Sequence, residues 1–284
     1  MMTHQAIDAV VTMALQEDAP WGDVTSEAFI PADATATAIL RARVPGTFAG
    51  GEVFARSFLT VDDTLDVDVL HADGSTFEAG EALASVTGSA RAILRGERVA
   101  LNLVQRMSGI ATMTAAFVAA VSGTSARVVD TRKTMPGLRV LDRHAVVAGG
   151  GHNHRFSLSD AVLAKDNHLA VLTAGGLSVT DAIRSVRDRI GHTTHLEVEV
   201  DRIDQIEPVL AGGVDTIMLD NFTLDELREG VALVSGRALI EASGNVSLET
   251  IGAIAATGVD IISVGALTHS VRALDLGLDI DISR

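Results

Sequence analysis

Hydrophobic residues recur at two different spacings along the chain, and the spacing changes near residue 100. From Ile7 to Leu15, apolar residues follow the i, i+3, i+4 spacing of an amphipathic helix. Residues 35–90 hold short apolar segments broken by turn residues, which predicts a small antiparallel sheet. From Leu103 to Val121 the helical spacing returns, and it predicts a long helix that joins two domains.

After residue 121, short apolar runs alternate with amphipathic segments of helix length. The runs are "ARVVDT", "DAVLAKD", "HLEVEV", "TIMLDN", "ALIEAS" and "DIISVG". This alternation predicts parallel β-α units, and the later spacing of roughly twenty residues per unit favours a closed β/α barrel over a doubly wound open sheet. In either fold, ligands bind at the carboxyl ends of the strands, where each of these runs places a polar residue or a glycine.

Composition narrows the class of protein. The chain has 284 residues, 47% of them hydrophobic, which is enough for a large core. A formal net charge of -15 opposes binding to nucleic acid and to anionic membranes. The absence of cysteine excludes disulfides and thiolate metal sites, and it agrees with a cytoplasmic location. We expect neither a signal peptide nor a membrane-spanning segment.

Cations gather locally in this acidic chain, beginning in "VVDTRKTMPGLR" at residues 128–139. Arginine and lysine at strand ends are suited to carboxylates and phosphates, so the cluster predicts a small polyanionic ligand. The alternative is that each cation is a solvated surface charge. The cluster comprises Arg98, Arg132, Lys133, Arg139, His152, His154, Arg155 and Lys165.

The segment "AGGGHNHR" at residues 148–155 has a second interpretation. In an extended stretch His152 and His154 share one face, and two such imidazoles in a barrel are typical of metal-dependent hydrolases. Arg155 and Lys165 place positive charge where metal ligands should be neutral or anionic. The sequence therefore favours an anion site, with the metal hydrolase as an alternative.

Acidic residues end two of the predicted strands. Glu197 and Glu199 alternate with valines and so face one side, and Asp220 ends the next strand. Buried acids need partners, so they predict bound Mg²⁺, sugar hydroxyls or a cationic neighbour. The alternative is that they form ion pairs with arginines or lysines of the barrel.

Small residues follow the last two predicted strands, in "EASGNVS" at 241–247 and "SVGALTHS" at 263–270. Backbone N–H groups in such late loops of β/α barrels bind phosphate. The ligand is therefore predicted to carry phosphate and carboxylate groups. No nucleophile is evident, so the chemistry is expected to depend on positioning and charge stabilisation.

Taken together, these motifs resemble those of the quinolinate phosphoribosyltransferase family almost from end to end. The resemblance includes "EDAPWGDVTS", "ERVALNLVQRMSGIAT", "DTRKTMPGLR", "GGGHNHR", "AKDNHL", "EVEV", "MLDN", "EASGN" and "SVGALTHS" in that order. It implies an α/β fold with an N-terminal α/β sandwich domain at 1–102, joined by residues 271–284. Residues 103–270 would form an incomplete, seven-stranded β/α barrel, with "HNHR" as the seventh strand.

The resemblance also implies an activity: transfer of a phosphoribosyl group from phosphoribosyl pyrophosphate to quinolinate, with decarboxylation to nicotinate mononucleotide. The implied quinolinate ligands are Arg132, His154, Arg155 and Lys165, with Arg98 from a partner subunit. Lys133, Glu199 and Asp220 would be catalytic, with Glu199 and Asp220 holding Mg²⁺. Ser243, Gly244 and Gly265 would bind the 5-phosphate.

The resemblance implies a homodimer or a larger homo-oligomer with a shared active site. Met135, Ser157 and Arg272 depart from the family pattern, and none is an implied ligand. Two rivals keep the fold or the cations but change the function: a related enzyme that uses nicotinate or another substrate, and a non-catalytic protein that senses or stores an anionic metabolite.

Overall fold

The computed structural model describes residues 2–283, and these divide into two compact units. The first unit comprises residues up to 115, residues 134–150 and residues from 267 onward; the second comprises 116–133 and 151–266. The N-terminal domain was expected to end at residue 102. The first unit instead continues along the long helix to residue 115 and includes residues 134–150 from the middle of the chain. A boundary between domains at 102 stays a prediction.

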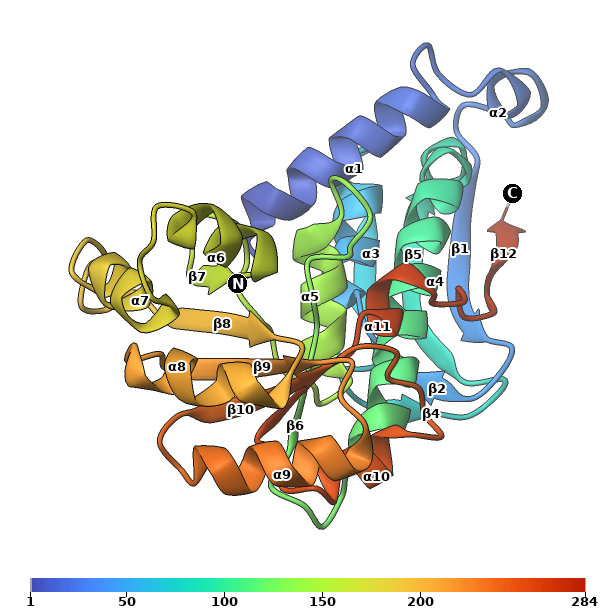
Figure 1. Cartoon of the computed structure of the whole chain (residues 1–284). Helices are drawn as coiled ribbons and strands as arrows, with labels where there is room; N and C mark the ends of the chain where they lie inside the picture. The colour runs from blue at the N-terminus through green and yellow to red at the C-terminus, as the bar shows by residue number, and fades with distance from the viewer. Residues whose placement is uncertain (1, 284) are drawn as a thin grey trace. The chain divides into compact units, whose positions relative to one another are not determined.

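The first unit combines helices with an antiparallel sheet (Figure 1). Its helices are α1 (His4–Asp18), α2 (Val24–Phe29), α3 (Gly51–Leu59), α4 (Ala90–Ala120), α5 (Arg139–Ala148) and α11 (Ala266–His269), of which α4 runs on past residue 115. Its strands are β1 (Thr35–Ala42), β2 (Gly46–Thr47), β3 (Asp66–Val69), β4 (Thr76–Phe77), β5 (Ala82–Ser89) and β12 (Leu276–Ser283).

The main sheet of this unit has the order β12-β1-β5-β3, and all its pairs are antiparallel. The central strand β1 alternates exposed and buried residues, so one face of the sheet carries apolar side chains. The segment 276–283 returns to pair with β1, with Thr35 opposite Ser283. The predicted α/β fold of the N-terminal domain is therefore confirmed, and the C-terminal strand β12 pairs with its central strand.

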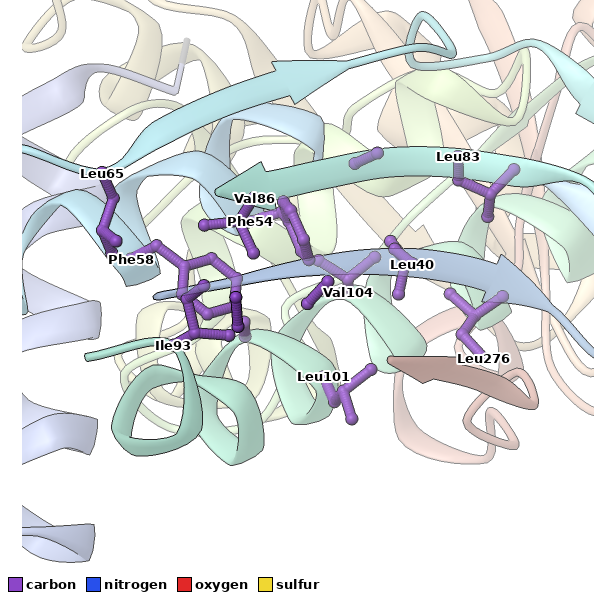
Figure 2. Packing of buried hydrophobic residues seen from close by; sticks show 14 of the residues in the cluster. Leu40, Phe54, Phe58, Leu65, Leu83, Val86, Ile93, Leu101, Val104 and Leu276 are labelled. Carbon is purple, nitrogen blue, oxygen red and sulfur yellow. The ribbon is translucent and has the colours of Figure 1, made fainter. Parts of the chain in front are cut away.

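Helices α3 and α4 supply the other half of the core of this unit. Figure 2 shows Phe54 and Phe58 from α3 and Ile93, Leu101 and Val104 from α4 packed against strand residues. Helix α4 is long and apolar enough to cross a membrane by length and composition. Because many of its apolar side chains lie in this buried cluster, packing in a core accounts for its hydropathy.

The second unit alternates strands and helices. Its strands are β6 (Arg127–Val129), β7 (Val162–Ala164), β8 (Leu196–Val200), β9 (Thr216–Asp220), β10 (Leu239–Ser243) and β11 (Ile261–Ser263). Its helices are α6 (Asp166–Thr173), α7 (Val179–Arg187), the short 3₁₀ helix η1 (Ile203–Gln205), α8 (Ile206–Ala211), α9 (Leu224–Val234) and α10 (Ile251–Ala255). Each strand lies in one of the six predicted runs.

The six strands form a parallel sheet that curls into an incomplete barrel (Figure 1). The sheet order is β6-β11-β10-β9-β8-β7, so the first strand along the chain pairs with the last. On the other side of β6, Val129 forms an isolated parallel bridge with His152. The seventh strand predicted in "HNHR" is therefore reduced to this bridge. Among the described residues no pairing joins it to β7, and the barrel is open there.

Candidate active site

A cavity of about 610 Å³ lies at the carboxyl ends of the barrel strands. Nine of the residues predicted to bind substrate or metal, or to act in catalysis, line it: Arg132, Lys133, His154, Arg155, Lys165, Glu199, Asp220, Ser243 and Gly244. Parallel strands bring their carboxyl ends to one edge, so residues more than 100 positions apart in sequence meet here. The cations and carboxylates predicted to act together therefore do share one cavity.

Two predicted residues lie elsewhere. Arg98 is exposed on α4 and belongs to the first unit. Gly265 follows β11 and is not among the residues that line the cavity. His152, from the alternative metal site, is exposed and is also absent from the cavity wall.

Strand alternation brings the two glutamates of β8 to one side, as predicted. Glu199 pairs with Lys165, whose Nζ lies 2.5 Å from Glu199 Oε2. The cationic neighbour expected as an alternative for this carboxylate is therefore present. Glu197 lies deeper and is 3% exposed.

At the cavity wall, Glu197 and Glu241 enclose the imidazole of His154. His154 Nε2 lies 3.1 Å from Glu197 Oε2 and 3.4 Å from Glu241 Oε2. Both carboxylates are almost fully buried, and the Oε1 atom of each has no hydrogen-bond partner. The backbone N–H of His154 also donates to Asp130 at 2.7 Å. We call His154, Glu197 and Glu241 the buried triad.

The buried triad holds a proton tightly. Burial lowers the pKa of His154, but hydrogen bonds with Glu197 and Glu241 outweigh burial and raise this pKa to about 10. Burial also raises the pKa of Glu197. Both shifts describe one shared proton, because an imidazolium with two carboxylates has the same net charge as a neutral imidazole with one carboxylate and one carboxylic acid.

A backbone contact determines where the neutral imidazole carries its hydrogen. His154 Nδ1 accepts a 2.7 Å hydrogen bond from the N–H of Arg155, so Nε2 carries the hydrogen and faces the carboxylates. The three ligand atoms of the triad lie within 4.8 Å of one another, close enough for one metal ion. A metal would need the lone pair of Nε2, which this tautomer does not offer. The geometry therefore favours a shared proton over a metal ion.

The loops after β9 and β10 have left-handed backbone at three positions in the cavity wall. Asn221 has φ 59°, Gly244 φ 99° and Asn245 φ 48°. Asn221 donates its backbone N–H to the carbonyl of Ser243 at 2.9 Å, which joins the two loops. Left-handed backbone is costly for most residues and common for glycine and asparagine, which explains these residue types here.

A second cavity, of about 520 Å³, adjoins the first and shares Arg132, Arg155, Leu163 and Lys165 with it. Its remaining wall is mainly apolar and includes Leu196, Val198 and further residues of β7, α6 and α7. The three shared cations therefore lie where a polar cavity meets an apolar one. Helix α6, which contributes to the apolar wall, has no buried residue.

Several polar residues of the cavity wall were not predicted to have a role, among them Asn221, Glu241 and Asn245. Glu241 and Ser243 alternate on β10, so the spacing that paired Glu197 with Glu199 could have placed Glu241 on the interior face. Asn221 follows strand β9, and Asn245 follows Gly244. Asparagine tolerates left-handed backbone, and this preference was the signal in the sequence that could have placed both residues in tight loops.

Comparison with known proteins covers nearly the whole chain. The family model described as quinolinate phosphoribosyl transferase, C-terminal domain, matches residues 110–279, and the corresponding N-terminal domain model matches residues 23–108. A nicotinate-nucleotide pyrophosphorylase (carboxylating) from Mycobacterium leprae is 45% identical over 279 residues, which cover 95% of each protein. A probable enzyme of the same name from Bacillus subtilis is 39% identical, covering 99% of this chain and 96% of the relative.

Solved structures give the same result. NadC from Streptococcus pyogenes has a TM-score of 0.94 and 39% sequence identity, covering 100% of this chain and 99% of that chain. The nicotinate-nucleotide pyrophosphorylase from Francisella tularensis has a TM-score of 0.91 and 33% identity, covering 99% of this chain and 98% of that one. Sequence and fold thus agree over both units.

Proposed function

The chain belongs to the quinolinate phosphoribosyltransferase family, and on this premise we propose how the cavity at the strand ends performs the reaction. The enzyme transfers a phosphoribosyl group from phosphoribosyl pyrophosphate to quinolinate in the biosynthesis of NAD. The products are nicotinate mononucleotide, pyrophosphate and carbon dioxide. The observation that carries the proposed assignment of residues is the meeting of cations and carboxylates in one cavity.

Arg132, Arg155 and Lys165 are the proposed ligands of the two carboxylates of quinolinate. They line both cavities, so a ring seated between them would have its carboxylates on the cations and its apolar face toward the apolar wall. Burial lowers the pKa of Arg155, and the positive charge of Arg132 adds to this effect. Like charges held together in this way favour a dianionic ligand.

Lys133, Glu199 and Asp220 are the proposed catalytic residues. The pyridine nitrogen forms a bond to the anomeric carbon while the bond from that carbon to pyrophosphate breaks, so positive charge develops on the ribose. Glu199 and Asp220 would stabilise that charge, and Lys133 would stabilise the departing pyrophosphate. The alkylated ring then accepts the electron pair of the bond to the adjacent carboxylate, carbon dioxide leaves, and the ring carbon takes up a proton.

Mg²⁺ is the proposed cofactor, and the donor set fits it. Glu199 and Asp220 offer carboxylate oxygens in one cavity wall, and oxygen ligands are what Mg²⁺ prefers. When bound, the ion would neutralise charge on pyrophosphate. Ser243, Gly244 and Gly265 are the proposed contacts for the 5-phosphate, with the left-handed backbone of Gly244 allowing close approach.

A homodimer or larger homo-oligomer is proposed, in which Arg98 reaches the site of a partner subunit. Arg98 is exposed in this chain. Large apolar side chains are exposed in the same unit, with Trp21 93%, Val24 77% and Phe29 81% accessible. Exposed apolar residues of this kind mark subunit contacts in many proteins. A cytoplasmic location is proposed on the same premise.

The test mixes the purified protein with phosphoribosyl pyrophosphate, Mg²⁺ and either quinolinate or nicotinate, and follows nicotinate mononucleotide. We expect product from quinolinate alone, and an Arg132→Ala variant that stays folded but has a KM for quinolinate raised about a hundredfold. Arg189→Ala, which removes an exposed arginine just after the end of α7 that lines neither cavity, is the matched control. Wild-type kinetics in Arg132→Ala would contradict the assignment of the carboxylate ligands.

A further inference from the structure

The side chain of Asn221 links an acidic residue of the cavity wall to the loop after β10. Its Nδ2 donates to Asp220 Oδ2 at 2.7 Å, and its Oδ1 accepts from Asn245 Nδ2 at 3.3 Å. Its backbone N–H donates to the Ser243 carbonyl at 2.9 Å. One residue thus makes three hydrogen bonds, all within the barrel unit.

These contacts fix the orientation of the amide. A flipped Asn221 would turn its oxygen toward the Asp220 carboxylate and its NH₂ group toward the NH₂ group of Asn245, and both contacts would be repulsive. The arrangement is therefore directional, with hydrogen bonds running from Asn245 through Asn221 to Asp220.

The loop after β10 is shaped to receive this amide. A Cβ atom added to Gly244 would overlap Asn221 Oδ1. Glycine is therefore required at 244 for the asparagine as well as for its positive φ. Asn221 and Asn245 both have left-handed backbone, which costs free energy that surrounding contacts must offset.

The consequence falls on Asp220. Within the described part of the chain, Asn221 is the only hydrogen-bond partner of this carboxylate. The bond occupies Oδ2 and leaves Oδ1 for a ligand. We propose that Asn221 is a positioning residue of the transferase reaction, which holds the Asp220 carboxylate in the orientation that phosphoribosyl pyrophosphate and its metal require. This inference rests on the proposed role of Asp220.

The first test is Asn221→Gly. Glycine keeps the left-handed backbone without strain and removes only the amide, so the loss measured is that of its hydrogen bonds with Asp220 and Asn245. We expect kcat/KM for phosphoribosyl pyrophosphate to fall about tenfold, with the Mg²⁺ concentration for half-maximal activity raised and the KM for quinolinate unchanged. Ser235→Gly is the matched control, because Ser235 is also left-handed but lies at the end of α9; it should behave as wild type.

The second test is Asn221→Asp, which keeps the size and the backbone preference of the residue. It replaces the donor to Asp220 with a carboxylate, so we expect a larger fall in kcat/KM for phosphoribosyl pyrophosphate than in Asn221→Gly. An Asn221→Asp enzyme as active as Asn221→Gly, or equal loss for both substrates in either variant, would overturn the proposal.

A double-mutant cycle separates this inference from the assignment of Asp220. Dissociation constants for phosphoribosyl pyrophosphate with Mg²⁺ are measured by calorimetry, which also serves for inactive variants. If Asn221 acts through Asp220, Asn221→Gly weakens binding in wild type but not in Asp220→Ala. An equal effect in both backgrounds refutes the positioning role alone. Wild-type turnover in Asp220→Ala would instead refute the proposed function of Asp220.

Discussion

Lys165 Nζ lies 2.5 Å from Glu199 Oε2, so the side chains at the ends of β7 and β8 are joined by an ion pair inside the proposed active site. The two residues are proposed to bind different substrates, with Lys165 on a quinolinate carboxylate and Glu199 on the ribose and its metal. Each ligand therefore competes with the ion pair for its own binding residue, and the two substrates are coupled through this pair.

Glu199→Gln should separate binding from chemistry. The neutral amide holds Lys165 less strongly, so quinolinate alone should bind at least as tightly as to wild type, while phosphoribosyl transfer falls by about two orders of magnitude. Calorimetry with quinolinate and a product assay check the two halves. Glu207→Gln breaks an exposed pair with Arg237 and should change neither. Weaker quinolinate binding in Glu199→Gln would mean that the pair does not compete with the ligand.

Glu241→Gln should make the buried triad release its proton at lower pH, because Glu241 is one of the two carboxylates that raise the pKa of His154. The folded pKa of about 10 exceeds the ordinary 6.5, so this proton adds stability that is complete below about pH 6.5 and is lost as pH rises toward 10. NMR titration of the imidazole follows the shift, and urea unfolding at neutral and alkaline pH follows stability. Glu229→Gln, at an exposed position, is the control. An unchanged titration of His154 would show that Glu241 does not interact with it.

Asp142→Asn should destabilise the fold by about 3 kcal/mol, because it leaves the Arg106 guanidinium without its charged partner. Asp142 is fully buried, and Arg106 donates two hydrogen bonds of 2.8 Å to it. Urea unfolding measures the change. Asp225→Asn removes a pair with Arg228 at a carboxylate that is 95% exposed, and should cost less than about 0.5 kcal/mol. Similar costs at the two sites would contradict the role given to burial.

Asp73→Asn should flatten the dependence of stability on acid pH. Burial raises the pKa of Asp73, but the hydrogen bonds from His144 and from the backbone of Gly51 and Gly50 outweigh it and hold the pKa below 3.8. A lowered pKa gives stability that is present above the unfolded value and is lost as pH falls. Urea unfolding between about pH 6 and about pH 3 compares the variant with wild type. Equal slopes would show that the Asp73 carboxylate is not responsible.

Much of the barrel was predictable because its signals are local. A strand's period of two placed Glu197 and Glu199 on one face, and the structure agrees, because Glu199 lines the cavity and Glu197 contacts His154 in the same cavity wall. The start of α4 was not predicted: the helix begins at Ala90, directly after β5 and two residues after Gly88, whose φ is 144°. The strand and the helix are contiguous, so this glycine lies inside the strand and no loop separates the two elements.

Interactions between strands distant in sequence were less predictable. Glu241 is 87 residues from His154, and only the closing of the barrel brings the two together. The motif "EASGN" predicted a phosphate-binding loop, but its first residue, Glu241, was given no role. Arg98 is a different case, because its proposed role lies in the site of a partner subunit, and spacing within one chain carries no information about such a contact.

The pairing of β12 with β1 has a consequence for synthesis on the ribosome. Strand β1 lies between β5 and β12 in the sheet. Every residue of the barrel unit is translated after β5 and before β12. Nascent chain up to residue 275 therefore exposes one edge of β1 with its backbone groups unpaired. Such an edge invites pairing with other chains, so chaperone dependence during translation should centre on the sheet whose sequence emerges first.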